Sequence, residues 1–346
     1  MTREAADQGG LMEVSGAVYG VRLRGRLPEE FRAHLPPRAG DRAEPGGSVE
    51  VSYRSFEELP AVEEIWVSEA EGSRLPGRFA LFRLPGEGFG LTVAADGRGL
   101  FRCDPRSIGI EWASPGTAAP HYFFSYALPL WLETRGVPVL HASAVSVEGR
   151  AVAFLGRSGV GKSVLCAELL RLGCGFLADD ALALYRDEGR AEGPDARGAW
   201  RCAPGPPLLR LWPSGLERRL EIAANALPKV HRSLEKRQLL LGRESAAPPE
   251  SGLPLAAVYV LARRPEAGGP VEISRCGARD ALVRVIEHSV AAAPAAALGL
   301  SGRRLERLAD LVETTPVRLL GYPSGAGSAA RVREAILEDL GDVRPG

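Results

Sequence analysis

Residues 156–163 constrain the fold of this 346-residue chain more than any other segment. They read Gly-Arg-Ser-Gly-Val-Gly-Lys-Ser, which satisfies the G-x-x-x-x-G-K-[ST] pattern of a phosphate-binding loop in full. The apolar run at 151–155 predicts a strand buried on both faces just before the loop. Apolar residues at helical intervals over 162–172, ended by Gly173, predict a helix just after it. This order of strand, loop and helix predicts an α/β fold with a phosphate site.

Each residue type in the loop has a physical part in holding a phosphate. Glycine lets backbone N–H groups point at an anion without interference from a Cβ atom, and the helix start adds the positive end of its dipole. Lys162 would place an ammonium on the outer phosphates, and the Ser163 hydroxyl would ligate Mg²⁺. The candidate nucleotide-binding residues are Gly156, Arg157, Ser158, Gly159, Val160, Gly161, Lys162 and Ser163.

Two adjacent acids, Asp179 and Asp180, follow a predicted strand at 175–178. The carboxyl end of such a strand lies at the edge of the sheet where ligands bind in open α/β folds. Adjacent residues at a strand end point in different directions, so two roles are natural. One acid can hold Mg²⁺ and the other can take a proton from an attacking hydroxyl.

The first part of the chain has a different pattern. It predicts short strands separated by turns, with a hairpin around the Asp96-Gly97 turn signal. We therefore predict a small antiparallel β-rich domain over residues 1–120, which could recognise a substrate or partner. The predicted strands lie at 18–24, 49–53, 79–84, 89–93 and 100–103.

From His121 onward, strand and helix patterns alternate. This predicts a second domain over residues 121–346 with a central, mainly parallel sheet. Segments 188–205 and 244–252, rich in glycine, proline and charge, are predicted loops. Helices are predicted at 122–135 (ended by Gly136), 280–292, 303–314 and 329–340, and strands at 137–145, 258–261 and 317–320.

Composition excludes several classes of protein. The 43 basic and 43 acidic residues give a net charge of zero, which argues against binding to nucleic acid or an anionic membrane. The five cysteines have no metal-ligand spacing and predict free thiols in a reducing compartment. Neither a signal peptide nor an apolar membrane span is visible in the sequence, so a cytoplasmic protein is expected.

The run from His141 through the loop to Asp180 resembles the catalytic core of the HPr kinase/phosphorylase family. That core has a His shortly before the loop strand, the G-x-S-G-x-G-K-S loop, and an Asp-Asp pair after a helix ending like Glu-Leu-Leu-Arg-Leu-Gly at 168–173. Within this family, the chain most resembles the HPr-kinase-like serine kinases that carry a different N-terminal domain, which include the kinases of lasso-peptide and related modified-peptide gene clusters. Their opening motif resembles 19–30, and their Leu-His-Ala-Ser-Ala-Val strand is present at 140–145.

The resemblance implies a fold like that of HPr kinase and phosphoenolpyruvate carboxykinase, and ATP- and Mg²⁺-dependent phosphorylation of a serine on a peptide or small protein. It implies Asp179 as the general base, Asp180 and Ser163 as metal ligands, and His141 and Lys162 beside the reacting phosphate. The two acids could exchange roles. Family members also assemble into homo-oligomers, so oligomerisation is an open alternative here.

The sequence departs from that of HPr kinase itself in two ways that bear on its activity and its target. Val164 stands where that enzyme has Glu after the loop serine, and the C-terminal signature associated with dephosphorylation is absent from the sequence. Both argue against phosphorylase activity and against HPr as the target. A nucleotide-binding regulatory module without transfer, and a small-molecule phosphotransferase, remain alternative functions.

The segment 227–238 concentrates further basic residues. Lys236 or Arg237 could stabilise charge on the transferring phosphoryl group, which would add both to the candidate cofactor-binding residues. The alternative is a solvated basic helix face. A predicted strand at 208–213 precedes segment 227–238 and would bring it back across the sheet toward the loop.

Overall fold

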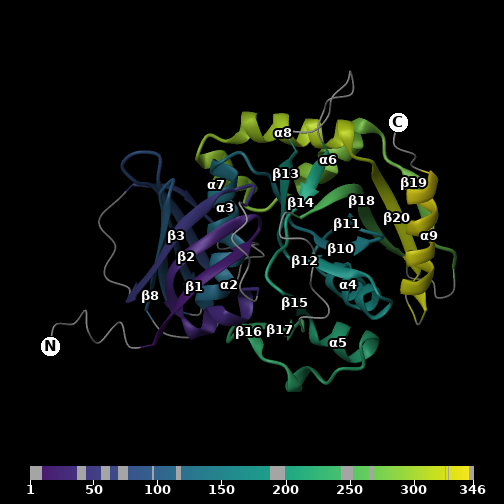
Figure 1. The fold of residues 1–346 in the computed structure, drawn as a ribbon, viewed down its shortest axis with the longest axis horizontal. Coiled ribbons are helices and arrows are strands. Elements are labelled where there is room, and N and C mark those ends of the chain that lie inside the picture. The colour runs from purple at the N-terminus through teal and green to yellow at the C-terminus, as the bar shows by residue number, and fades with distance from the viewer. Residues whose placement is uncertain are drawn as a thin grey trace.

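The computed structural model describes residues 10–36, 44–55, 63–68, 77–95, 97–113, 118–187, 199–242, 252–264, 269–323, 325 and 327–342. Two large sheets lie beside each other, the N-terminal one on the left in Figure 1. None of the helices formed by these residues has the length and apolar character needed to span a membrane. The cysteines are unpaired, as predicted.

The N-terminal sheet has eight strands within the described residues, in the order β1-β2-β3-β8-β7-β6-β5-β4. Most neighbours are antiparallel, but β3 runs parallel to both β2 and β8, so the predicted antiparallel domain is corrected to a mixed sheet. The strands are β1 (Leu11–Val18), β2 (Val21–Pro28), β3 (Ser48–Ser55), β4 (Glu64–Val67), β5 (Arg78–Arg83), β6 (Phe89–Ala95), β7 (Gly97–Cys103) and β8 (Ser107–Trp112).

The predicted β6–β7 hairpin is confirmed, although Asp96 itself lies outside the described residues. The predicted strand at 18–24 is divided, because Val18 ends β1 and residues 21–24 begin β2. Tyr19 (φ 55°) and Gly20 (φ 72°) adopt left-handed backbone conformations there, and they form the turn between β1 and β2. A short 3-10 helix, η1 (Glu29–His34), follows β2.

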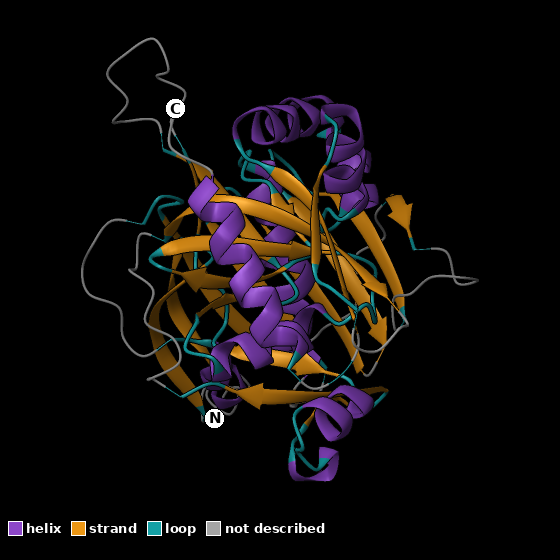
Figure 2. Cartoon of the chain, turned by 90° about the vertical axis from the view of Figure 1, so that its right-hand side faces the viewer, coloured by secondary structure: helices purple, strands orange, loops and turns teal. Residues whose placement is uncertain are grey.

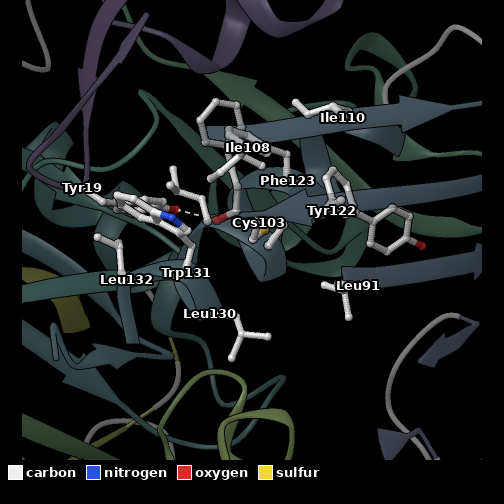
Figure 3. Close-up of a cluster of buried hydrophobic side chains, with 14 of the residues drawn as sticks. Tyr19, Leu91, Cys103, Ile108, Ile110, Tyr122, Phe123, Leu130, Trp131 and Leu132 are labelled. Carbon is white, nitrogen blue, oxygen red and sulfur yellow. Dashed lines mark hydrogen bonds between the residues drawn. The ribbon is translucent and has the colours of Figure 1, made fainter. Parts of the chain in front are cut away.

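The predicted helix at 122–135 is present but begins earlier and contains a π-helical turn. Its parts are α2 (Ala118–Tyr122), the π turn η2 (Phe123–Ala127) and α3 (Leu128–Thr134). Pro129 lies in the first turn of α3, directly after the π-helical turn η2. The segment packs into the same apolar core as the N-terminal sheet; Figure 3 shows Phe123 and Trp131 among strand residues such as Ile108.

The second sheet follows the order β12-β10-β11-β18-β14-β13-β9 within the described part of the chain, with β20 beside β18 and β19 beside β20. Among the strand pairs that the structure describes in this sheet, β11–β18 and β18–β20 are parallel and the others antiparallel, so the prediction of a mainly parallel sheet is wrong. Its strands are β9 (Val139–Leu140), β10 (Ser143–Val147), β11 (Arg150–Leu155), β12 (Gly175–Ala178), β13 (Leu182–Arg186), β14 (Trp200–Cys202), β18 (Leu253–Arg264), β19 (Glu272–Arg275) and β20 (Val317–Pro323).

The predicted strand at 137–145 is also divided. Its first part is β9, which pairs with β13, and its second part is β10, which pairs with β11 and β12. His141 and Ala142 carry the chain between these separate positions in the sheet. The division leaves His141 at a break between two strands.

Helices cover both faces of this sheet. Val152 and Phe154 of β11 join the apolar cluster with α4 (Lys162–Arg171) and α9 (Ser328–Asp342), while Ala153 and Leu155 join the cluster with α6 (Ala278–Glu287) and α8 (Ser301–Thr314). Figure 2 shows α9 lying across the strands. The strand before the loop is therefore buried on both faces, as predicted.

The remaining elements change two further predictions. The predicted helix 280–292 ends as α6 at Glu287, and a separate helix, α7 (Ala292–Ala297), follows after Ala291 (φ 51°). The predicted loop 188–205 contains β14, and residues 188–198 lie outside the described residues, as do 243–251.

A three-stranded sheet lies below the second sheet in Figure 1, in the order β15-β17-β16 within the described residues. Segment 227–238 is thus a β-hairpin, and the predicted alternative of a basic helix face is wrong. Its elements, with the short helices beside them, are β15 (Leu208–Leu211), α5 (Pro213–Arg219), η3 (Ala224–Ala226), β16 (Lys229–His231) and β17 (Leu234–Leu240).

Candidate active site

The glycine-rich loop joins β11 to α4. Three of its glycines have positive φ angles, 149° at Gly156, 84° at Gly159 and 110° at Gly161, which side-chain-bearing residues rarely adopt. The backbone N–H of Leu165 donates to the carbonyl of Gly161 at 2.8 Å, so helical hydrogen bonding begins directly after the loop. The arrangement is that of a phosphate-binding cradle at a helix N-terminus.

Lys162 lies over this cradle and is 6% exposed. Its Nζ donates to the carbonyl oxygen of Gly156 at 2.7 Å. Burial lowers the pKa of Lys162 to about 8, although Asp179 and Asp180 oppose this shift by attracting the ammonium. The side chain therefore carries a charge that changes close to neutral pH.

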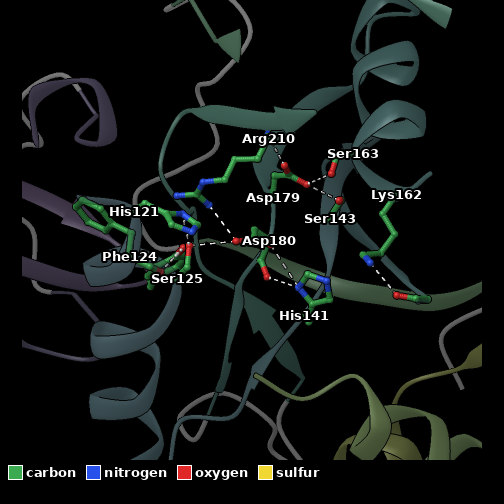
Figure 4. A network of polar contacts seen from close by, with 12 residues as sticks. His121, Phe124, Ser125, His141, Ser143, Lys162, Ser163, Asp179, Asp180 and Arg210 are labelled. Carbon is green, nitrogen blue, oxygen red and sulfur yellow. Dashed lines mark hydrogen bonds and ion pairs between the residues drawn. The ribbon is translucent and has the colours of Figure 1, made fainter. Parts of the chain in front are cut away.

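Asp179 follows the end of β12 and is 2% exposed. Its Oδ1 accepts hydrogen bonds from the hydroxyls of Ser163 at 2.8 Å and Ser143 at 2.6 Å. Its Oδ2 accepts one from the backbone N–H of Arg210 at 2.8 Å. Figure 4 shows this carboxylate facing the start of α4. The pairing of the loop serine with a strand-end carboxylate provides two oxygen ligands suited to Mg²⁺.

Asp180 has different partners because its backbone turns, with φ at 75°. Its Oδ2 accepts from Ser125 Oγ at 3.0 Å and from the Arg210 guanidinium at 3.2 Å. Burial alone would raise the pKa of this carboxyl, but Lys236, Arg210 and the nearby imidazoles hold it well below its ordinary value. Asp180 is therefore ionised at neutral pH.

His141 lies beside Asp180. Its Nδ1 is 2.9 Å from the Asp180 carbonyl oxygen and 3.5 Å from Oδ1. A carbonyl can only accept, so Nδ1 carries the hydrogen, and Nε2 of the neutral ring is left as an acceptor. Burial lowers the pKa of His141, which favours this neutral form.

Arg210 on β15 was not predicted to belong to the site. It is 2% exposed, and its Nε and NH2 groups have no hydrogen-bond partner among the described residues. The available signal was a lone cation within the otherwise apolar run Leu-Leu-Arg-Leu, because a buried guanidinium needs an anion beside it. Ser143 lies within the Leu-His-Ala-Ser-Ala-Val motif at 140–145 but was not singled out, and Ser125 carried no comparable signal.

Lys236 and Arg237 are separated by the alternation of β17. Lys236 lines the cavity around the loop, with Nζ 5.8 Å from the centre of the Trp212 ring. Arg237 does not line it and lies 3.8 Å from Glu235 instead. The structure brings Lys236 to the loop and leaves Arg237 outside.

We call this space the nucleotide cavity. It is bounded by Ser158–Ser163 of the loop, both acids, His141, Arg210 and Lys236. The described residues contain no cluster of three or more His, Cys, Asp or Glu side chains that could hold a metal by themselves. Ser163 and Asp179 suit Mg²⁺, which keeps waters and takes further oxygens from substrate phosphates. Val164 supplies no ligand and packs on apolar neighbours.

No family model and no curated protein matches the sequence. Among solved structures, the chain is similar to the Hpr(Ser) kinase/phosphatase from Coxiella burnetii, with a TM-score of 0.30 and 11% identity over 59% of this chain and 93% of that one. A likeness at this TM-score carries no argument about the fold or the activity. The function is therefore inferred from the geometry of the site.

Proposed function

We propose that the chain is an ATP- and Mg²⁺-dependent kinase that phosphorylates a seryl hydroxyl on a peptide or small protein. The observation that carries this proposal is the division of labour between two neighbouring acids. Asp179 binds the loop serine, while Asp180 turns toward His141 and Ser125. A protein that only binds a nucleotide needs no second, ionised carboxylate beside the phosphates.

The family resemblance implies Asp179 as the general base and Asp180 as a metal ligand, but the contacts favour the opposite assignment. Asp179 shares Ser163 Oγ and would hold the metal with it, so we assign Asp180 as the group that accepts the hydroxyl proton. Mg²⁺ bound there would neutralise charge on the phosphates. Lys162 and Lys236 would bind phosphate oxygens, and Arg210 would orient Asp180.

The low pKa of Asp180 is compatible with this role. Phosphoryl transfer passes through a loose transition state, in which positioning and charge stabilisation dominate catalysis. The hydroxyl oxygen forms a bond to the γ-phosphorus as the bond to the leaving diphosphate breaks, and the proton passes to Asp180. An ionised, fixed carboxylate orients the hydroxyl by accepting its hydrogen bond before transfer.

A transfer assay with γ-labelled ATP, Mg²⁺ and serine-containing peptides tests the proposal. Lys162→Ala should weaken nucleotide binding, whereas Asp180→Asn should retain binding and lose transfer by about 100-fold or more. A regulatory module would be supported instead if the protein binds ATP but transfers phosphate to no peptide, and if Asp180→Asn binds a partner protein as tightly as the wild type does. ATP consumption with metabolites alone would support a small-molecule phosphotransferase.

A further inference from the structure

We propose that a second cavity adjoining the nucleotide cavity binds the acceptor as an extended polypeptide segment, with uncharged apolar or aromatic residues flanking its serine. This inference rests on the proposed kinase function and names the substrate class of that site. We call the space the acceptor cavity. Its walls come from α2, η2, β17, the end of α6 and the start of the glycine-rich loop.

Asp180 lies at the junction of the two cavities. Asp180, His141 and Lys236 line both, whereas Asp179 and Ser163 line only the nucleotide cavity. A hydroxyl in the acceptor cavity can therefore reach Asp180 without displacing a metal held by Asp179. This separation agrees with the assignment of Asp180 to the acceptor and Asp179 to the nucleotide.

The wall opposite the loop is largely uncharged. It carries His121, Tyr126, Leu234 and His288. Burial holds the pKa of His121 well below its ordinary value and lowers that of His288 to about 4, so both rings are neutral at pH 7. A charged flanking residue that contacts this wall would lose hydration without a charged partner on the wall itself, whereas an apolar or aromatic residue would contact the rings.

The wall of two imidazoles, one phenol ring and a leucine offers ring and apolar contacts to a polypeptide segment. The polar side chains of His141, Ser158, Asp180 and Lys236 line the nucleotide cavity as well, so they lie where the two cavities meet. At its edge, Trp212 is 40% exposed and Glu287 is also exposed, so a polypeptide can enter and leave across the rim. The cations Arg157 and Lys236 lie on the phosphate side.

In the reaction, the serine hydroxyl oxygen forms its bond to the γ-phosphorus of the nucleoside triphosphate. The bond from that phosphorus to the leaving diphosphate oxygen breaks, and the hydroxyl proton passes to Asp180. The products are a phosphoserine, a nucleoside diphosphate and a proton that returns to solvent.

The test compares Leu234→Arg with Leu240→Arg. Both residues are on β17, but Leu234 lines the acceptor cavity and Leu240 is 52% exposed outside both cavities. The probes are alanine-based peptides with one serine flanked by Phe, Ala, Lys or Glu. Transfer from γ-labelled ATP and the nucleotide dissociation constant are measured for each variant, and Leu234→Asn provides a milder change at the same position.

Wild-type protein is expected to prefer Phe- or Ala-flanked serine. Leu234→Arg should raise the KM for those peptides about tenfold or more, Leu234→Asn should raise it less, and Leu240→Arg should leave it unchanged. Nucleotide affinity should be equal in all four proteins. If the wild type transfers phosphate but Leu234→Arg and Leu240→Arg have the same KM for the peptides, the proposed acceptor site is overturned. A wild-type preference for peptides with Lys or Glu beside the serine would overturn it as well. Absence of transfer to any peptide would instead overturn the kinase proposal.

Discussion

At the residue scale, Ser125 connects the helical segment of the N-terminal core to the proposed catalytic acid. Its Oγ is 3.0 Å from Asp180 Oδ2, and it belongs to the π-helical turn η2. Single π-helical turns inside α-helices are frequent at functional sites. Ser125 is therefore a positioning residue that acts through Asp180.

We predict that Ser125→Ala lowers kcat about tenfold, because one hydrogen bond to an ionised group is worth about 1.5 kcal/mol. Ser125→Thr, which keeps the hydroxyl, should recover part of the rate. Nucleotide affinity should not change in either variant. Steady-state kinetics together with nucleotide titration check this, and a loss confined to KM would contradict a positioning role.

Lys162 should make nucleotide binding depend on pH. Its pKa is lowered to about 8 in the structure by burial, and an anionic nucleotide binds the protonated form more tightly. The association constant should therefore fall as pH rises through 8, by up to about tenfold per pH unit. Titrations above neutral pH in wild type and in Lys162→Met measure the effect. A slope retained by the methionine variant would assign it to another group.

Lys236 and Arg237 are adjacent cations on β17, and they provide a matched pair of variants because only Lys236 lines the nucleotide cavity. Lys236→Gln should lower the rate of phosphate transfer by about tenfold or more, because it removes a cation that lines the nucleotide cavity. Arg237→Gln removes a neighbouring charge that lies outside the cavity and should retain the wild-type rate. Transfer rates at saturating ATP measure both, and equal losses would show that the overall charge of the hairpin, rather than position, matters.

The place of the loop residues and of the two acids in the site could be predicted, because their geometry follows from their spacing in the sequence. Gly156, Lys162 and Ser163 stand in one short motif next to a strand and a helix. Arg210 and Ser125 meet Asp180 from 30 and 55 positions away. Such tertiary contacts depend on how elements pack, and no local pattern encodes them.

At the element scale, α3 and α8 meet at a buried ion pair. Glu133 Oε1 is 3.3 Å from Arg304 Nε and accepts the backbone N–H of Val139 at 3.0 Å. Burial raises the pKa of Glu133 to about 7 despite the opposing charge of Arg304. The folded state thus holds a proton that the unfolded chain has lost between pH 4.5 and 7.

Stability should therefore fall as pH rises through this window. The contribution of Glu133 is fully present below pH 4.5 and lost above about 7, and it amounts to about 3 kcal/mol. Comparing the free energy of unfolding of wild type and Glu133→Gln across these pH values isolates it, since the glutamine cannot titrate. Parallel pH profiles of the two proteins would contradict the prediction.

Element positions were easier to predict than strand directions. The buried run of β11 and the helical patterns of α4, α8 and α9 were visible in the sequence because each follows a simple apolar period. Pairing direction depends on where the chain re-enters the sheet. Segment 137–145 shows this, because β9 and β10 look like one strand in the sequence yet pair with different partners.

At the scale of the whole molecule, the N-terminal sheet and the second half of the chain share packing. Leu128, Trp131 and Ala183 join the same apolar cluster as Phe101 and Ile110 of the sheet. We predict that a fragment of residues 121–346 does not fold stably, because it would expose the apolar faces of η2 and α3. Circular dichroism and hydrogen exchange of the fragment measure this, and a cooperative unfolding transition would contradict it.

The most direct test of the account is the Mg²⁺ dependence of ATP affinity in Asp179→Asn and Asp180→Asn, measured by calorimetry. If Asp179 and Ser163 hold the metal, Asp179→Asn should remove most of the gain in affinity that Mg²⁺ gives the wild type. Asp180→Asn should keep that gain while losing transfer. The reverse pattern, or equal loss in both variants, would contradict the assignment of the two acids.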